Sequence, residues 1–363
     1  PLSFKAPFLF ELELAKGITS ARVLWCLSVA KFCAGFPLGL RFRARLGIIS
    51  FSDCPSSHTH RADMQAKVNV SCPACRSTSI GEAVAVPDRE YCMAYLARYA
   101  PCLECGTLFQ IPMPSFEQLG AFYPAHYHAA TAHGVLARAR HRARLRQLEP
   151  LLQDPGALLD YGCGNGAFLL WAAGQNLGRP LFGYEIGTER EMQRLAGGAV
   201  TIIRGRPEHL LEVLPPCRLI SMNHVIEHLP DPFTTIMALN ASLAPGGSIQ
   251  GQTPAADSRE RRVFGKNWSG YHAPRHTVVF SRRGLGLMLE RAGLHNPRVT
   301  PAFNPAAIAV SLAASTRPTS RGIARHGAGW VAWLGCATLL APVDLAGGSS
   351  GIINFQAYRP TEP

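Results

Sequence analysis

The stretch Leu158-Leu-Asp160-Tyr-Gly162-Cys-Gly164-Asn-Gly166 decides the fold of this chain. Its apolar start is typical of a buried strand, and three glycines at alternate positions follow at once. Glycine lets a backbone pass close under a ligand, where any side chain would clash. Glu185 stands at the end of the next apolar run, where an acid can accept hydrogen bonds from both hydroxyls of a ribose. A glycine turn followed by such an acid predicts a nucleoside cofactor.

Strand-like and helix-like segments alternate after residue 156, which predicts an α/β fold with a parallel sheet wrapped by helices on both faces. Ligands of such sheets bind beyond the carboxyl ends of the strands. We expect strands at 157–161, 181–185, 200–203, 218–225, 248–253, 298–300 and 352–358, and helices at 167–175, 189–196, 232–243 and 284–292.

The glycines alone leave two cofactors open, because Gly162, Gly164 and Ala167 also satisfy the loose G-x-G-x-x-A pattern of an NAD-dependent oxidoreductase. The surrounding residues resemble class I S-adenosylmethionine-dependent methyltransferases. The resemblance lies in Leu158–Gly166 as motif I, in Ser221–Pro232 as the next motif, and in Leu243-Ala-Pro-Gly-Gly247 as the turn before the fifth strand. It covers about residues 70–300 and implies a Rossmann-like methyltransferase fold with a mostly parallel seven-stranded sheet.

The resemblance also implies which residues hold S-adenosylmethionine. In that family an acid two residues before the first glycine faces the methionine moiety, which here is Asp160. The chain departs from the family after the third strand, where Arg206-Pro207-Glu208 replaces the usual adenine acid, so Glu208 is a candidate there. The expected cofactor-binding residues are Asp160, Gly162, Cys163, Gly164, Gly166, Glu185 and Asn223.

A histidine-rich segment, Trp268-Ser-Gly-Tyr-His272-Ala-Pro-Arg275-His276, resembles a substrate-side segment of a bacterial subset of these enzymes. Methyl transfer to a hydroxyl needs a base for the proton, and histidine has the right intrinsic pKa. His228, His272 and His276 are the catalytic candidates. Arg275 either holds a phosphate or carboxylate of the acceptor or closes the loop through a salt bridge. By resemblance we expect O-methylation of a small-molecule or sugar-nucleotide acceptor, with a quinone-like metabolite as the alternative.

The segment His224-x-x-Glu227-His228 resembles an E-x-x-E-H metal site of ubiquinone-pathway O-methyltransferases, with His224 replacing the first glutamate. Two imidazoles and a carboxylate can bind a divalent ion. Equally, Glu227 and His228 can order the loop without a metal.

Four cysteines pair as Cys72-Pro-Ala-Cys75 and Cys102-Leu-Glu-Cys105. Two such knuckles close a tetrahedron of thiolates and predict a structural Zn²⁺ site in a zinc ribbon; a redox disulfide is the alternative. Structural zinc implies a reducing compartment, so we expect a cytoplasmic protein. A non-enzymatic zinc-ribbon binding module on a methyltransferase fold stays open as a further alternative.

The formal net charge of +12 favours an acidic partner. Alternate arginines from Arg138 to Arg146 cannot share one helical face, so we expect them in solvent and do not expect nucleic acid as a partner. Apolar stretches at 306–314 and 330–343 are each too short to span a bilayer as a straight helix. They predict a helical hairpin packed on the domain or a peripheral membrane contact through 305–349.

These expectations give six segments. The sequence predicts a poorly ordered leader or non-native extension at 1–63, a zinc-ribbon-like domain at 64–115 that begins at Met64, and a linker with a basic helix at 116–155. A methyltransferase domain follows at 156–304, then the apolar hairpin at 305–349 and the last strand with the tail at 350–363.

Overall fold

The computed structural model describes residues 70–123, 134–187, 189–316, 322–323, 325 and 327–361. The chain divides into two compact units, Pro1–Lys67 and Val68–Pro363, and every described residue belongs to the second. The predicted leader at 1–63 lies outside the described residues.

The centre of this unit is an eight-stranded sheet with the order β11-β12-β9-β8-β4-β5-β7-β6. Five neighbouring strands, from β9 to β7, run parallel. The strands β6, β11 and β12 are antiparallel to their neighbours, so the sheet is mixed where the sequence predicts seven mostly parallel strands. The bounds are β4 (Ala157–Tyr161), β5 (Leu181–Ile186), β6 (Glu191–Leu195), β7 (Val200–Gly205), β8 (Cys217–Asn223), β9 (Leu243–Pro254), β11 (His295–Pro301) and β12 (Ile352–Tyr358).

The edge strand β6 corrects the helix that the sequence predicts at 189–196. It pairs with β7, with Glu191 opposite Arg204 and Leu195 opposite Val200. Gly197 and Gly198 have positive φ and help turn the chain directly back into β7. No residue of β6 is buried, so a helix would gain no packed apolar face there, and helix propensity alone is a weak preference.

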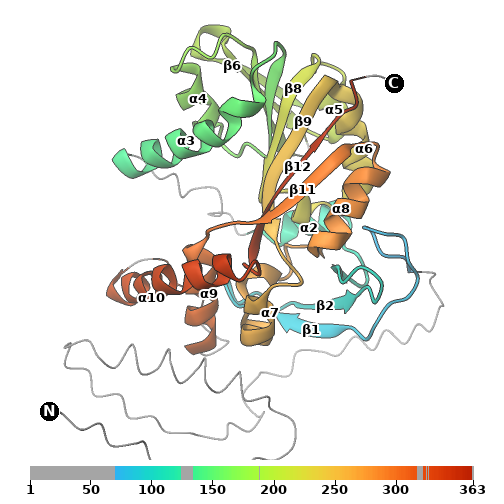
Figure 1. The fold of residues 1–363 in the computed structure, drawn as a ribbon, viewed down its shortest axis with the longest axis vertical. Helices are drawn as coiled ribbons and strands as arrows, with labels where there is room; N and C mark the ends of the chain where they lie inside the picture. Colours follow the sequence, from blue (N-terminus) through green and yellow to red (C-terminus); the bar gives the residue numbers. More distant parts are fainter. Residues whose placement is uncertain are drawn as a thin grey trace, which may run out of the picture. The chain divides into compact units, whose positions relative to one another are not determined.

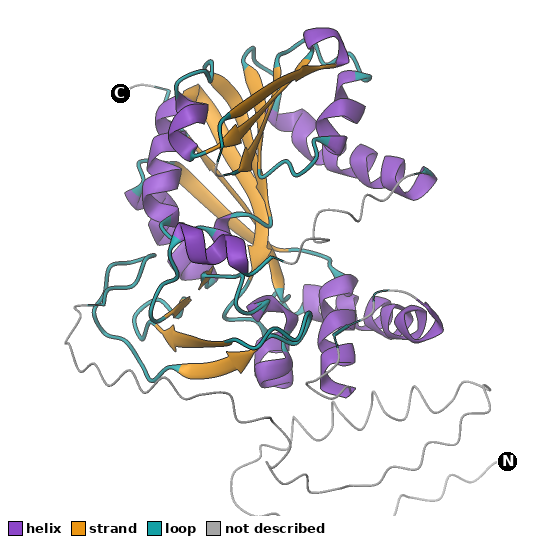
Figure 2. Cartoon of the chain, turned by 180° about the vertical axis from the view of Figure 1, so that it is seen from behind, coloured by secondary structure: helices purple, strands orange, loops and turns teal. Residues whose placement is uncertain are grey.

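Helices cover both faces of the sheet (Figures 1 and 2). One face carries α3 (Val135–Leu148) and α4 (Ala167–Ala173). Leu145, Leu148, Phe168 and Leu169 of these helices share a core with Leu158 of β4. The other face carries α5 (Pro207–Leu211), α6 (Pro232–Ser242) and α8 (Arg282–Arg291). The helices predicted at 167–175, 232–243 and 284–292 are therefore confirmed.

A second, four-stranded sheet with the order β1-β2-β3-β10 connects the cysteine segment to the rest of the unit. The cysteine segment supplies β1 (Val84–Pro87), β2 (Leu96–Pro101) and β3 (Leu108–Gln110), and α2 (Phe116–Ala121) follows. The fourth strand, β10 (Val278–Val279), comes from the end of the histidine-rich segment, and Val278 lies opposite Phe109. The cysteine segment and the histidine-rich segment therefore share one sheet.

Two apolar helices, α9 (Pro305–Thr316) and α10 (Gly327–Ala346), pack against each other. α9 also contacts α7 (Arg259–Phe264). α10 is longer than the apolar stretch at 330–343 that the sequence predicts. It has 20 residues, which is about 30 Å at the rise of an α-helix. Among the residues that the structure describes, it is the one helix long and apolar enough to cross a membrane by length and composition.

Candidate active site

The turn after β4 is shaped by its glycines. Gly162 and Gly164 have φ angles of +80° and +58°, which residues with a side chain rarely adopt. A Cβ atom on Gly162 would lie 2.3 Å from Cγ2 of Val225, whereas a Cβ atom on Gly164 would meet no atom within 4 Å. Gly162 is therefore required by packing, and Gly164 presents bare backbone toward open space.

Two of the expected cofactor residues flank this turn. Glu185, at the C-terminal end of β5, accepts a hydrogen bond through Oε2 from the Gly164 amide at 2.6 Å. Asp160 is buried in β4 and forms a bidentate ion pair with Arg144 of α3, with N–O distances of 2.5 and 3.1 Å. Arg144 also donates to Ser221 Oγ at 2.8 Å, so it ties α3 to the ends of β4 and β8.

The position of Arg144 corrects the expectation that the alternate arginines all lie in solvent. Leu145 and Leu148 bury one side of α3 in the core of the sheet. Arg144 is consequently turned inward, with its guanidinium 4.0 Å from the ring centroid of Phe168 and its side chain 22% exposed. The sequence carried no clear signal for this contact, because arginines spread around the helix and leave no distinct apolar stripe.

The exit of β8 lies directly beside the glycine turn, since Val225 is the residue that packs on Gly162. β8 ends at Asn223, and a short 3-10 helix, Ile226–His228, follows. Glu227 in this turn is fully buried, and it accepts a hydrogen bond from Thr253 Oγ1 at 3.0 Å. Burial would raise the pKa of Glu227, but His224, whose Nδ1 lies 3.3 Å from its Oε1, helps to lower it.

The structure brings together all three predicted histidines, although they come from two separate segments. The ring centroids of His228 and His276 are 4.6 Å apart, those of His272 and His276 are 5.0 Å apart, and those of His228 and His272 are 6.1 Å apart. These three side chains are called the histidine cluster below. Burial lowers the pKa of His228 to about 4 and that of His276 well below its ordinary value, so both are neutral near pH 7.

Two members of the histidine cluster have one ring nitrogen fixed by a backbone carbonyl. His276 donates from Nδ1 to the Gly270 carbonyl at 2.8 Å. His228 Nδ1 lies 3.1 Å from the Arg275 carbonyl and 2.8 Å from Tyr123 Oη. Because a carbonyl oxygen only accepts, Nδ1 carries the proton in both rings and Nε2 keeps its lone pair. Tyr123 lies in the predicted linker, where no sequence pattern assigns it to the site.

His272 and Arg275 belong to a buried ionic network instead. His272 Nδ1 lies 2.8 Å from Glu90 Oε1, and its Nε2 accepts from Arg275 Nε at 3.0 Å. Arg275 is fully buried and pairs bidentately with Asp88 at 2.9 and 3.1 Å. The structure therefore favours the salt-bridge alternative for Arg275, because no part of its guanidinium reaches solvent to hold an acceptor.

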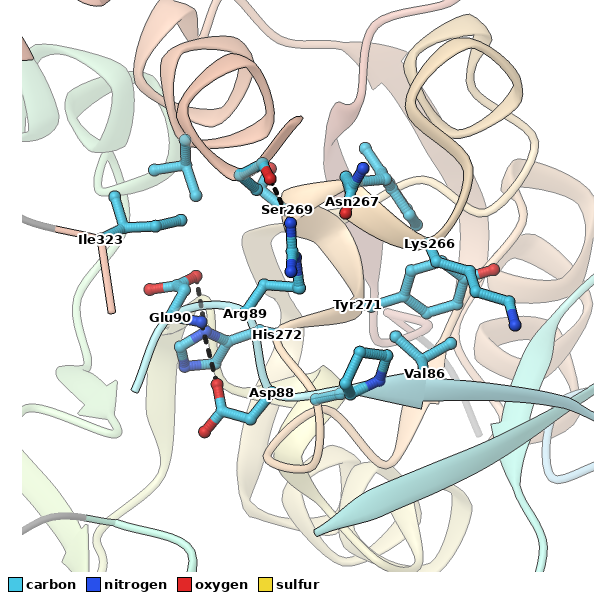
Figure 3. A pocket seen from close by; sticks show the side chains of 15 residues that line it. Val86, Asp88, Arg89, Glu90, Lys266, Asn267, Ser269, Tyr271, His272 and Ile323 are labelled. Carbon is cyan, nitrogen blue, oxygen red and sulfur yellow. Dashed lines mark hydrogen bonds and ion pairs between the residues drawn. The ribbon is translucent and has the colours of Figure 1, made fainter. Parts of the chain in front are cut away.

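A pocket opens beside this network, between β1, the histidine-rich segment and α9 (Figure 3). Glu90 and His272 face each other in its wall, and Lys266 and Asn267 line another side. Burial alone would raise the pKa of Glu90, but His272, Arg325 and Arg275 lower it to about 2. Glu90 is thus ionised and holds the wall of the pocket together.

The described residues contain two groups with the donors for a metal ion. The first is Cys72, Cys75, Cys102 and Cys105, whose sulfurs lie within 4.8 Å of one another. Two sulfur pairs are 3.5 and 3.7 Å apart, close to the roughly 3.8 Å edge of a tetrahedron with Zn–S bonds of about 2.3 Å. This geometry fits zinc.

The second group is Glu227, His228 and His276, also with donor atoms within 4.8 Å. His276 takes the place that the sequence analysis gave to His224, whose side chain is 42% exposed. The Glu227 oxygens and the Nδ1 atoms of both histidines also have protein partners, which orders this loop.

Residues 129–298 match the family model described as "Methyltransferase domain". No curated protein sequence matches the chain. Among solved structures, the chain resembles a SAM-dependent methyltransferase from Archaeoglobus fulgidus, with 19% identity, a TM-score of 0.40, and coverage of 61% of this chain and 94% of that one. It also resembles phosphoethanolamine N-methyltransferase 2 from Haemonchus contortus, with 13% identity, a TM-score of 0.43, and coverage of 69% and 61%. The family match therefore places a methyltransferase domain at residues 129–298.

Proposed function

We propose that this methyltransferase domain transfers the methyl group of S-adenosylmethionine to a hydroxyl of a small-molecule or sugar-type acceptor. The observation that carries the proposal is the packing of Val225 on Gly162. It makes the cofactor turn and the segment of Glu227 and His228 direct neighbours at the carboxyl ends of β4 and β8. Ligands of open α/β sheets bind at that edge.

The residues around the glycine turn fit the two ends of the cofactor. Glu185 would accept hydrogen bonds from the ribose hydroxyls while it holds the Gly164 amide. Asp160 and Arg144 form a paired anion and cation beside the turn, which matches the amino and carboxylate groups of a methionine moiety. The bare backbone at Gly164 leaves room for the ligand between them.

S-adenosylmethionine held at this turn would supply its methyl group to the acceptor oxygen, and the electron pair of the carbon–sulfur bond would go to sulfur. The bound cofactor supplies the activated methyl group, so the protein mainly aligns the partners. The hydroxyl proton goes to His228 Nε2, which is unprotonated because Nδ1 faces the Arg275 carbonyl. Burial lowers the pKa of His228, and the charge of Glu227 partly offsets this by favouring the protonated ring.

Comparison of metabolite extracts by mass spectrometry tests this assignment. Cells that express the wild-type chain should contain an acceptor species heavier by one methyl substitution, and His228→Gln should lower its amount about 100-fold or more. The control His295→Gln changes an exposed histidine of β11 and should leave the product unchanged. Undiminished product in the His228→Gln variant, with S-adenosylmethionine still bound, would remove His228 from the mechanism.

We further propose that Cys72, Cys75, Cys102 and Cys105 hold one structural zinc ion, supported by their near-tetrahedral sulfurs. The two knuckles have matching turns: the Cys72 amide donates to the Ser77 carbonyl, and the Cys102 amide donates to the Thr107 carbonyl. This repeat is expected when both chain segments wrap one ion. Cysteines that hold zinc must stay reduced, which supports a cytoplasmic location.

A further inference from the structure

The helix α10 exposes an apolar face that nothing in the described unit covers. Val331, Leu339 and Val343 are 67%, 59% and 56% exposed. Between these residues the exposed positions are alanine, glycine, threonine and proline. A surface helix of a soluble protein normally places charged residues on its solvent face, and α10 has none there.

The opposite face of α10 is the one that packs. Ala337, Ala341 and Asp344 are buried at a helical spacing of three and four residues. Asp344 is the only charged residue of the helix, and its Oδ1 lies 3.5 Å from Arg259 Nη1 of α7. This ion pair and the packing on α9 hold the C-terminal end of α10 on the protein body.

We propose that α10 lies flat in the headgroup region of an anionic lipid bilayer, with Val331, Leu339 and Val343 inserted. The chain segment between α9 and α10 carries Arg317, Arg321 and Arg325 and no acidic residue. Arg325 pairs with Glu90, and the charge of the other two complements anionic lipid. Trp330 and Trp333 lie half-buried in the first two turns of the helix, and such rings favour the interface between water and hydrocarbon.

Lipid fits this face better than a second protein. Protein interfaces depend on aromatic and arginine anchors at their centre. The exposed positions of α10 carry neither, and its two tryptophans are half-buried near its N-terminal end. Its exposed residues are aliphatic or small, which suits contact with acyl chains at the headgroup boundary. The packing on α9 and the Asp344–Arg259 pair keep the helix parallel to the body surface, so spanning the bilayer would require breaking both.

Flotation of the full chain with phosphatidylcholine vesicles, with and without phosphatidylglycerol, tests this proposal. Wild type should float with the anionic vesicles and less with pure phosphatidylcholine. The triple variant Val331→Ser, Leu339→Ser, Val343→Ser should lose at least about tenfold in partitioning, because three inserted side chains are removed. Its melting temperature should not fall, since all three side chains are exposed.

The matched control Leu96→Ser, Leu103→Ser changes two residues of the cysteine segment that are 59% and 64% exposed, and it should float like wild type. Equal flotation of wild type and the triple variant would overturn the proposal, as would a wild type that does not float. Sedimentation without lipid adds one more outcome: a dimer in wild type that becomes a monomer in the triple variant would identify a second copy as the occupant and also overturn it.

Discussion

Glu185 accepts a hydrogen bond from the Gly164 amide, and we propose that it also binds the ribose hydroxyls of the cofactor. Glu185→Ala should weaken S-adenosylmethionine binding more than tenfold, since the loss of hydrogen bonds to a charged group costs about 1.5–3 kcal/mol. Isothermal titration calorimetry measures this. Glu212→Ala is the control, as that residue forms an exposed ion pair with Arg190, and it should bind like wild type. Unchanged affinity of Glu185→Ala would contradict the assigned site.

The histidine cluster should make the fold sensitive to mild acid. The pKa of His228 is about 4 in the folded protein against an ordinary 6.5, so the unfolded chain takes up this proton first as the pH falls. Stability is then complete above pH 6.5 and declines between pH 6.5 and about 4. Melting temperatures across this range should fall less steeply for His228→Gln than for wild type. Parallel slopes would show that His228 does not titrate in this window.

Residues whose role depends on neighbours in sequence could be predicted, and residues that reach the site from distant elements could not. Asp160 and Glu185 stand at strand ends, so their placement beside the glycine turn follows from the alternation of strands and helices. Arg144 and Tyr123 arrive from elements before the sheet, through packing that no local pattern records. Arg275 was ambiguous for the same reason, because its partner Asp88 lies far away in the sequence.

At the scale of elements, the start of α8 is pressed against the cysteine knuckle. A Cβ atom on Gly284 would lie 2.1 Å from Thr107 Oγ1 and 3.1 Å from Cys105 Sγ. Gly284→Ala should therefore lower stability by about 1–3 kcal/mol, the usual cost of overpacking, as measured by chemical denaturation. Gly286→Ala is a matched control in the same helix, because a Cβ atom there meets nothing within 4 Å. It should be neutral or stabilising, since alanine favours helix. Equal effects of the two variants would contradict the packing described here.

The elements themselves were predictable where hydrophobic period and turn signals agree, as for β4, α4, α6 and α8. The prediction of a helix at β6 was wrong. The sequence shows the helix propensity of this segment, but it does not show that the segment pairs as an unburied strand at the sheet edge. The pairing of β10 with β3 joins residues about 170 positions apart, and a two-residue strand has no period to detect.

At the scale of the whole unit, the segment that carries the four cysteines also contacts residues of the methyltransferase domain. Arg291 of α8 donates to the Ala74 carbonyl at 2.5 Å, and Ser281 donates to the Cys105 carbonyl. The protein purified without added metal should contain about one zinc per chain by elemental analysis. Cys75→Ser with Cys102→Ser should lose the zinc and lower the melting temperature of the methyltransferase domain. Cys336→Ser, outside the cluster, should keep the zinc. A metal-free wild type would refute the zinc assignment.

The central claim is that one S-adenosylmethionine binds at the turn between β4 and α4, opposite the histidine cluster. Calorimetric titration of the full chain with S-adenosylmethionine and, separately, with NAD tests it most directly. The structure predicts saturable binding of about one S-adenosylmethionine per chain, weakened more than tenfold in Glu185→Ala. It predicts no saturable binding of NAD. Saturable NAD binding together with no response to S-adenosylmethionine would contradict the account.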